Sequence, residues 1–188
     1  MSHVELWADA LALLRDWQPP DQAQASLAQA YLGFLLARPD ATARSCVPGH
    51  LTASAVVLSA DRASTLLTLH PRVARWLQLG GHCEDDDNSI AGAALREATE
   101  ESGIEGLRIQ PQPIRLDVHP ISCSLGIPTR HFDVRFAVIA PPGALPVISG
   151  ESEDLAWWPV DGLPQPIGVG VADTVAAAIG TGFAAESC

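Results

Sequence analysis

Three glutamates with helical spacing are the residues of this sequence best suited to chemistry. Glu97, Glu100 and Glu101 stand at positions i, i+3 and i+4, so a helix places their carboxylates on one face. Like charges at this spacing repel one another, and the arrangement becomes favourable when a hard divalent cation such as Mg²⁺ lies among the oxygens. A solvated acidic face is the alternative interpretation, and the flanking residues decide between the two.

Those flanking residues form a longer pattern from Gly81 to Ile104, here termed the acidic box. The segment resembles the signature of the Nudix (MutT-like) hydrolases, G-x5-E-x7-R-E-U-x-E-E-x-G-U, in which U is an apolar residue. The second half of the signature is matched at every position: Arg96, Glu97, Ala98, Glu100, Glu101, Gly103 and Ile104. The first half differs, because 14 residues separate Gly81 from Arg96 where the signature has 13.

The extra residue leaves the first acidic position of the signature on either Asp87 or Asn88. We expect it to affect the loop before the helix more than the helix itself, so that metal binding is retained. We also expect substitution of either residue to cost less activity than substitution of the helix glutamates.

The resemblance implies what the acidic box does. Family members bind a divalent metal there and hydrolyse a diphosphate joined to another group. Carried over to this chain, the cofactor is Mg²⁺ or Mn²⁺, and its ligands are Glu97, Glu100, Glu101 and the carbonyl of Gly81. Arg96 orients the acidic side chains. The three glutamates and Arg96 are then the catalytic residues.

The base that accepts a proton from the attacking water has two candidate locations. One is the box itself, at Glu100 or Glu101, and the other is a late acidic loop that contains Glu151 and Glu153. The expected substrate is a small diphosphate derived from a nucleotide. A non-catalytic domain that senses a nucleotide is the alternative function, because the first half of the box is lengthened.

Two strand-like segments after the box, residues 114–119 and 131–136, alternate polar and apolar residues. Their polar positions are Arg115, Asp117 and His119 on the first segment and His131, Asp133 and Arg135 on the second. A hairpin can pair these positions like with like, histidine opposite histidine and aspartate opposite aspartate. A slip of two residues pairs aspartate with arginine instead, and we expect this register because it is electrostatically easier.

The polar face of these strands has three interpretations: an ordinary surface with ion pairs, a substrate-recognition face, and a second metal site. The recognition hypothesis assigns substrate binding to His131, Asp133 and Arg135. His82, which directly follows the two glycines at the start of the box, is a further candidate. It either touches a phosphate or leaving group of the substrate or caps the loop.

The rest of the chain supplies the elements that must position the box. Apolar residues at helical spacing predict helices over residues 4–17 and 21–38, which together form an N-terminal helical hairpin. Strand-like runs at 51–59 and 64–70 precede the helix of the box, which spans about 89–102. The hairpin packs either on its own domain or on a second copy of the chain, as in a homodimer.

A short strand at 155–158 and a helix at 171–179 complete the pattern. Strands both before and after a central helix predict an α/β (α+β) fold. With the resemblance added, the expected architecture is a Nudix-type mixed β-sheet between helices. Residues 1–47 are then an N-terminal helical extension, and residues 48–188 are the hydrolase domain.

The composition limits the partners. The chain has 188 residues and a formal net charge of −11, and all 11 of its basic residues are arginines. It has no basic run that could follow a nucleic-acid backbone, and no apolar run near the roughly 18 residues that cross a bilayer. The start of the chain lacks the basic cluster of a secretory signal, and the 4 cysteines are widely spaced. We therefore expect a cytoplasmic protein that binds neither nucleic acid nor membrane.

Overall fold

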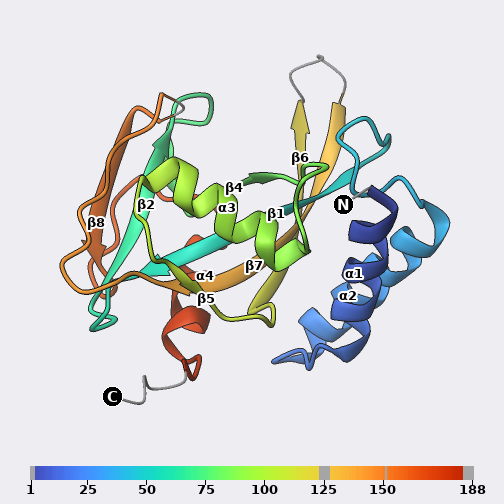
Figure 1. Cartoon of the computed structure of the whole chain (residues 1–188), viewed down its shortest axis with the longest axis horizontal. Coiled ribbons are helices and arrows are strands. Elements are labelled where there is room, and N and C mark those ends of the chain that lie inside the picture. The colour runs from blue at the N-terminus through green and yellow to red at the C-terminus, as the bar shows by residue number, and fades with distance from the viewer. Residues whose placement is uncertain (1–2, 123–127, 151, 184–188) are drawn as a thin grey trace.

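The computed structural model describes residues 3–122, 128–150 and 152–183. Its centre is an eight-stranded mixed sheet with helices on both faces (Figure 1), which confirms the expected α+β fold. The strands are β1 (His50–Leu58), β2 (Ser64–His70), β3 (Arg75–Leu77), β4 (Leu79–His82), β5 (Arg108–Ile109), β6 (Arg115–Ser122), β7 (Pro128–Ile139) and β8 (Asp154–Pro159). The helices are α1 (His3–Asp16), α2 (Gln22–Ala37), α3 (Ile90–Ser102) and α4 (Val171–Ile179).

The main path of the sheet runs β3, β2, β1, β7, β5. β4 pairs with β1, β6 with β7, and β8 with β2. Only the pair of β1 and β7 is parallel among the described strand pairs. None of the helices in the described part of the chain is long and apolar enough to cross a membrane.

β1 lies inside the sheet, and all nine of its residues are buried. Successive side chains of a strand point to opposite faces. Leu51, Ala53 and Val57 pack with the apolar residues of α1, α2 and α3 on one face. Val56 and Leu58 pack with α4 on the other. A strand covered on both sides needs such a near-continuous apolar sequence.

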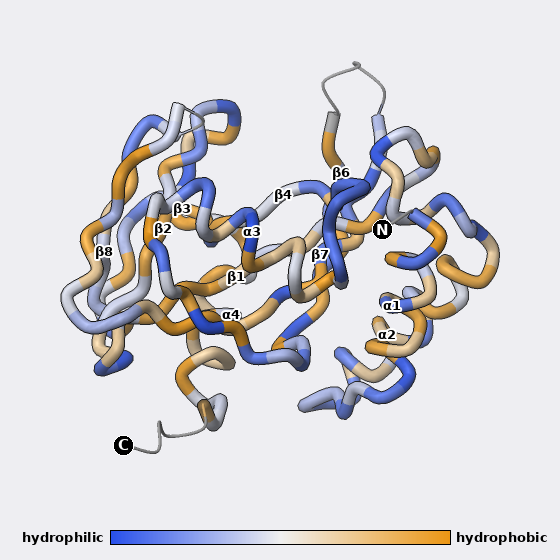
Figure 2. The backbone as a smooth tube through the Cα atoms, viewed as in Figure 1, coloured by the Kyte–Doolittle hydropathy of each residue, from blue (hydrophilic) through white to orange (hydrophobic). Residues whose placement is uncertain are grey.

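The helix of the acidic box, α3, has the expected ends. Ser89 caps its first turn by accepting a hydrogen bond from the Gly92 N–H at 2.9 Å. Gly103 ends it in a left-handed conformation, with φ 64°. Ala94 and Ala98 are buried against the sheet, and Glu97 and Glu101 lie beside them next to β4. Figure 2 shows the segment between β4 and α3 as a hydrophilic stretch of the chain.

The N-terminal hairpin packs on its own domain, beside β6 and β7 (Figure 1). The side chain of Gln24 binds the backbone of Leu116, accepting from its N–H at 2.6 Å and donating to its carbonyl at 3.1 Å. The Tyr31 hydroxyl lies 2.6 Å from the carbonyl oxygen of Asp117 and 3.0 Å from that of Asp133. These contacts fix α2 across both strands.

The register of β6 and β7 differs from the one we expected. Asp117 lies opposite Asp133, and His119 lies opposite His131, so the expectation of a two-residue slip is wrong. The reason is that Arg135 contacts both carboxylates from the unslipped register. Its Nε lies 2.9 Å from an oxygen of Asp133, and its Nη2 lies 2.9 Å from an oxygen of Asp117.

Candidate functional site

The guanidinium of Arg96 lies among the acidic residues of the box. Its Nε and Nη2 donate to the two carboxylate oxygens of Asp87, at 2.8 and 3.0 Å. Its Nη1 donates to Glu97 at 3.2 Å and to Glu100 at 3.0 Å. Nη2 also donates to the backbone oxygen of His82 at 2.9 Å. The hydrogen bonds that Arg96 donates to Asp87 raise the pKa of Arg96 above its ordinary value, so the guanidinium stays charged.

Of the two residues that the sequence left open for the first acidic position, Asp87 is the one that contacts Arg96. It is buried, and it also accepts a hydrogen bond from the Glu84 N–H at 2.7 Å, whereas Asn88 is exposed. The extra residue of the box is thus accommodated in the loop before α3. Asp87 is the buried partner of Arg96, and the expectation that its substitution costs less activity than that of the helix glutamates stays a prediction.

Two consecutive glycines bring the backbone of β4 against the carboxylates. The Gly80 N–H donates to Glu101 at 3.0 Å. Gly80 has φ +151°, and a Cβ there would lie 2.4 Å from the Cβ of Ser54. A Cβ on Gly81 would lie 2.6 Å from a carboxylate oxygen of Glu97. Only glycine permits this close approach at both positions.

The donor set fits a hard divalent cation. The carboxylates of Asp87, Glu97 and Glu100 contact the guanidinium of Arg96, Glu101 lies on the same helix, and carboxylate oxygens are the ligands that Mg²⁺ prefers. Among the described residues, the ligand oxygens of the three glutamates do not meet within 4.8 Å. The Glu100 side chain is 60% exposed, so it has room to turn from Arg96 toward the carboxylates of Glu97 and Glu101.

The late acidic loop passes the C-terminal end of α3. The Val147 N–H donates to the Ser102 carbonyl at 2.7 Å, and Glu153 follows at the edge of the sheet, where its N–H donates to the Leu69 carbonyl at 3.0 Å. Glu153 is exposed. Glu151 lies outside the described residues. The loop that carries both candidate bases therefore contacts the helix that carries the box glutamates.

On the polar face of the sheet, Asp133 and Arg135 are interior residues, each 4% exposed. Asp133 accepts hydrogen bonds from Thr52 at 3.1 Å and Ser54 at 2.8 Å, and it is paired with Arg135. Arg135 in turn donates to Thr174 of α4 at 2.9 Å. The two residues proposed for substrate recognition thus also join the sheet to α4.

The other two recognition candidates, His82 and His131, lie next to each other with their ring centroids 5.0 Å apart. His50, which the sequence did not single out, stands beside both. Burial lowers the pKa of His82 to about 4 and that of His131 to about 3, so both imidazoles are neutral near pH 7. The only sequence signal for His50 is its place directly before a predicted strand.

The family follows from a sequence match. A protein-family model described as the NUDIX domain matches residues 48–177, well over half of the chain. The chain belongs to the Nudix family. The family predicted from the acidic box is confirmed, and the chain is classed with the Nudix pyrophosphohydrolases. A comparison with curated proteins finds no match.

Solved Nudix structures share the fold of this chain. A NUDIX-family hydrolase from Clostridium perfringens is 22% identical with a TM-score of 0.52, and the match covers 70% of this chain and 96% of that one. A MutT NUDIX hydrolase from Burkholderia pseudomallei is 21% identical with a TM-score of 0.51, and the match covers 68% of this chain and 95% of that one. The NUDIX domain of Shewanella oneidensis NrtR, complexed with ADP ribose, is 19% identical with a TM-score of 0.51, and the match covers 78% of this chain and 95% of that one.

The Nudix match begins after α1 and α2, yet α1 contacts the acidic box, which is called the Nudix box from here on. The carboxylate of Asp9 accepts a hydrogen bond from the N–H of Ile90, the first residue of α3, at 2.8 Å. His3 Nε2 lies 3.2 Å from a carboxylate oxygen of Asp85 in the loop before α3. Sequence reasoning missed Asp9, because nothing in the spacing of residues links the two helices.

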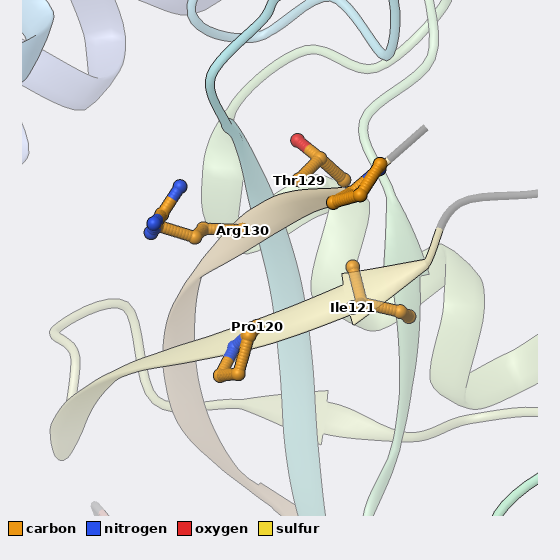
Figure 3. A pocket seen from close by; sticks show the side chains of 5 residues that line it. Pro120, Ile121, Thr129 and Arg130 are labelled. Atoms are coloured by element: carbon orange, nitrogen blue, oxygen red, sulfur yellow. The ribbon is translucent and has the colours of Figure 1, made fainter. Parts of the chain in front are cut away.

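An open pocket of about 240 Å³ lies at the far end of the β6–β7 pair (Figure 3). Its lining is Pro120, Ile121, Pro128, Thr129 and Arg130. These residues follow the His119–His131 pair toward the hairpin end. None of the lining residues belongs to the Nudix box, and the pocket adds no candidate catalytic group.

Proposed function

We propose that this Nudix protein is a Mg²⁺- or Mn²⁺-dependent pyrophosphohydrolase that cleaves the diphosphate linkage of a small, nucleotide-derived molecule. The observation that carries the proposal is the set of contacts around Arg96. One guanidinium binds Asp87, Glu97 and Glu100, while Gly80 binds Glu101. Acidic side chains are thereby collected at the end of β4, with an excess of negative charge that suits a divalent cation.

The residues that would hold the metal are Glu97, Glu100 and Glu101, with the Gly81 carbonyl. A bound ion supplies charge neutralisation at the phosphates and a water of lowered pKa. The role of Arg96 is to hold the box in shape, since its pair with Asp87 connects α3 to the loop before it. The missing Cβ of Gly81 leaves the space that Glu97 occupies.

The proton of the attacking water goes to a carboxylate. Glu100 is proposed because its side chain is largely exposed, and Glu101 because the Gly80 N–H fixes its position. Glu153 and Glu151 on the late loop are the alternatives. The contact of this loop with the end of α3 supports a base at Glu153.

Substrate recognition is proposed for the polar face of the sheet. His82 and His131 are partly exposed and are the candidates for direct contact. Asp133 and Arg135 are proposed to act by fixing this face, because both are buried and paired. We also propose residues 48–188 as the hydrolase domain and 1–47 as an extension that buttresses it.

A panel of nucleoside diphosphate derivatives tests the proposal. The protein is incubated with each compound, with and without Mg²⁺, and a phosphatase converts exposed phosphate monoesters to free phosphate for detection. We expect release only with metal and only from some of the compounds. Release that persists in EDTA, or no release from any compound with either Mg²⁺ or Mn²⁺, would contradict it.

A non-catalytic nucleotide-sensing domain is the second candidate function. The structure of the NrtR NUDIX domain complexed with ADP ribose supports it, because that domain shares the fold of this chain. The same panel distinguishes the two candidates. A sensing domain binds a compound such as ADP ribose in calorimetry and returns it unchanged in the presence of Mg²⁺, whereas a hydrolase consumes it.

A further inference from the structure

Three histidines from three strands meet on one face of the sheet. His50 begins β1, His82 ends β4, and His131 lies on β7, where it pairs directly with His50. The ring centroids are 5.0 Å apart in each of the three pairs. One ring nitrogen from each residue lies within 4.8 Å of those of the other two. We refer to these three residues as the histidine cluster.

The cluster contains buried nitrogens without a hydrogen-bond partner. His50 is 1% exposed, and neither of its ring nitrogens has a hydrogen-bond partner of good geometry, although the Cys46 backbone lies near the ring. The Nε2 atoms of His82 and His131 are likewise buried and unpaired. Leaving such groups unsatisfied costs stability, and native proteins rarely accept this cost without a compensating function. A metal ion that takes the nitrogen lone pairs would satisfy them together.

We propose that the histidine cluster binds a divalent transition-metal ion such as Zn²⁺, at a site separate from the carboxylates of the Nudix box. Neutral imidazole nitrogens suit Zn²⁺, Co²⁺, Ni²⁺ and Cu²⁺, whereas Mg²⁺ prefers oxygen. Tetrahedral Zn²⁺ with bonds of about 2.0–2.1 Å places its ligand nitrogens about 3.4 Å apart. The rings therefore need to move by only about 1 Å, and one coordination position stays open for water or a ligand oxygen.

The protonation states agree with this geometry. Burial lowers the pKa of all three histidines, although the Cys46 backbone acts against this at His50. The neutral imidazole is the form that binds metal. A fourth ring, that of His119, lies 5.3 Å from His131, but its Nδ1 is 2.8 Å from a carboxylate oxygen of Asp117.

One nearby charge opposes a bound cation. The exposed guanidinium of Arg44 lowers the pKa of each histidine of the cluster, so it also disfavours a metal ion there. The carboxylates of Asp117 and Asp133 lie two residues from His119 and His131 on the same face, and both are paired with Arg135. Replacing Arg44 with alanine is therefore expected to tighten metal binding.

His82 connects the cluster to the Nudix box. The backbone oxygen of His82 accepts the hydrogen bond from Arg96, while its side chain belongs to the cluster. The inference nevertheless goes beyond the proposed hydrolase, because metal binding is measured without substrate. If the cluster binds no metal, the proposal for the box is unaffected.

The test is a titration of EDTA-treated protein in excess Mg²⁺, which occupies oxygen sites. Co²⁺ binding is followed by visible absorption and Zn²⁺ binding by calorimetry. We expect the wild-type protein to bind one equivalent of Co²⁺ or Zn²⁺ tightly. His82→Ala and His131→Ala should weaken binding by more than about tenfold, since even the loss of a residue that only supports a ligand costs 10–100-fold. His70→Ala, which removes a histidine outside the cluster, should bind like the wild type.

Two controls keep the outcome interpretable. Glu100→Gln should lose Mg²⁺-dependent turnover and keep the Co²⁺ absorption, which separates the two sites. Thermal unfolding without metal shows whether each variant folds, and if His131→Ala does not, His82→Ala decides because His82 is partly exposed. The inference is overturned if the wild type binds no stoichiometric Zn²⁺ or Co²⁺, or if His82→Ala binds as tightly as the wild type.

Discussion

Asp87 and Arg96 form a two-point ion pair, with Nε and Nη2 of the guanidinium 2.8 and 3.0 Å from the two carboxylate oxygens. The Asp87 side chain is 3% exposed and that of Arg96 is 22% exposed. This pair joins the loop before α3 to the helix that carries the glutamates. Planar two-point pairs of this kind fix direction as well as distance, so the pair sets how α3 presents its acidic face.

Asp87→Ala is therefore expected to lower the free energy of unfolding by about 2–4 kcal/mol, because it leaves Arg96 without its buried partner. Urea denaturation measures the change. Asn88→Ala is the matched control, since Asn88 is the exposed neighbour and its loss should change stability by less than about 0.5 kcal/mol. Equal effects of the two substitutions would show that the pair has no structural role.

Gly81→Ala should reduce turnover by at least about tenfold while the protein stays folded. The added Cβ would lie 2.6 Å from a carboxylate oxygen of Glu97, and this flexible side chain can move aside at small cost in stability. Displacement of about 1 Å in a catalytic group is enough for a loss of this size. Steady-state kinetics and thermal unfolding of the same variant check both parts. Normal kinetics would show that Glu97 need not occupy this place.

Asp9→Ala should destabilise the protein by about 1 kcal/mol, as expected for the loss of an acceptor at a helix N-terminus. The Asp9 carboxylate accepts from the Ile90 N–H, so the substitution tests whether the N-terminal extension supports the Nudix box. Asp16→Ala, at the exposed end of the same helix, is the control and should show no loss. Equal stability of the two variants would show that the hydrogen bond between Asp9 and Ile90 does not support the Nudix box.

Much of this arrangement was readable from the sequence because it depends on local spacing. The three glutamates follow helical periodicity, Ser89 and Gly103 mark the ends of α3, and the alternation along β6 and β7 identifies the polar face. Each of these features arises within a stretch of some ten residues. The acidic box is equally local in the sequence, since it runs from the end of β4 to the end of α3.

The remainder depends on contacts between distant parts of the chain. His50 meets His131 only because β1 and β7 run parallel, and no residue pattern states which strands become neighbours. The Asp9 contact with Ile90 has the same cause. The register of β6 and β7 was predicted wrongly from charge pairing alone, because Arg135 reaches both aspartates across the strands.

Stability should fall as the pH drops from about 6.5 to about 4. Burial lowers the pKa of His82 from 6.5 to about 4 and that of His131 to about 3. In this window the unfolded chain binds protons that the folded chain does not, so acid favours unfolding by a few kcal/mol. Urea denaturation across this range measures it. The double variant His82→Gln and His131→Gln should show a smaller pH dependence, and an unchanged one would contradict the assignment.

The most direct test of the central claim is the rate of diphosphate hydrolysis as a function of Mg²⁺ concentration in the wild type, Glu100→Gln and Glu101→Gln. The amide keeps the size of the side chain and removes the charge that holds the metal. We predict that both variants unfold at nearly the wild-type temperature and lose at least about 100-fold in kcat even at saturating Mg²⁺. Near-normal turnover of either variant at saturating Mg²⁺ would contradict the assignment of that glutamate as a metal ligand.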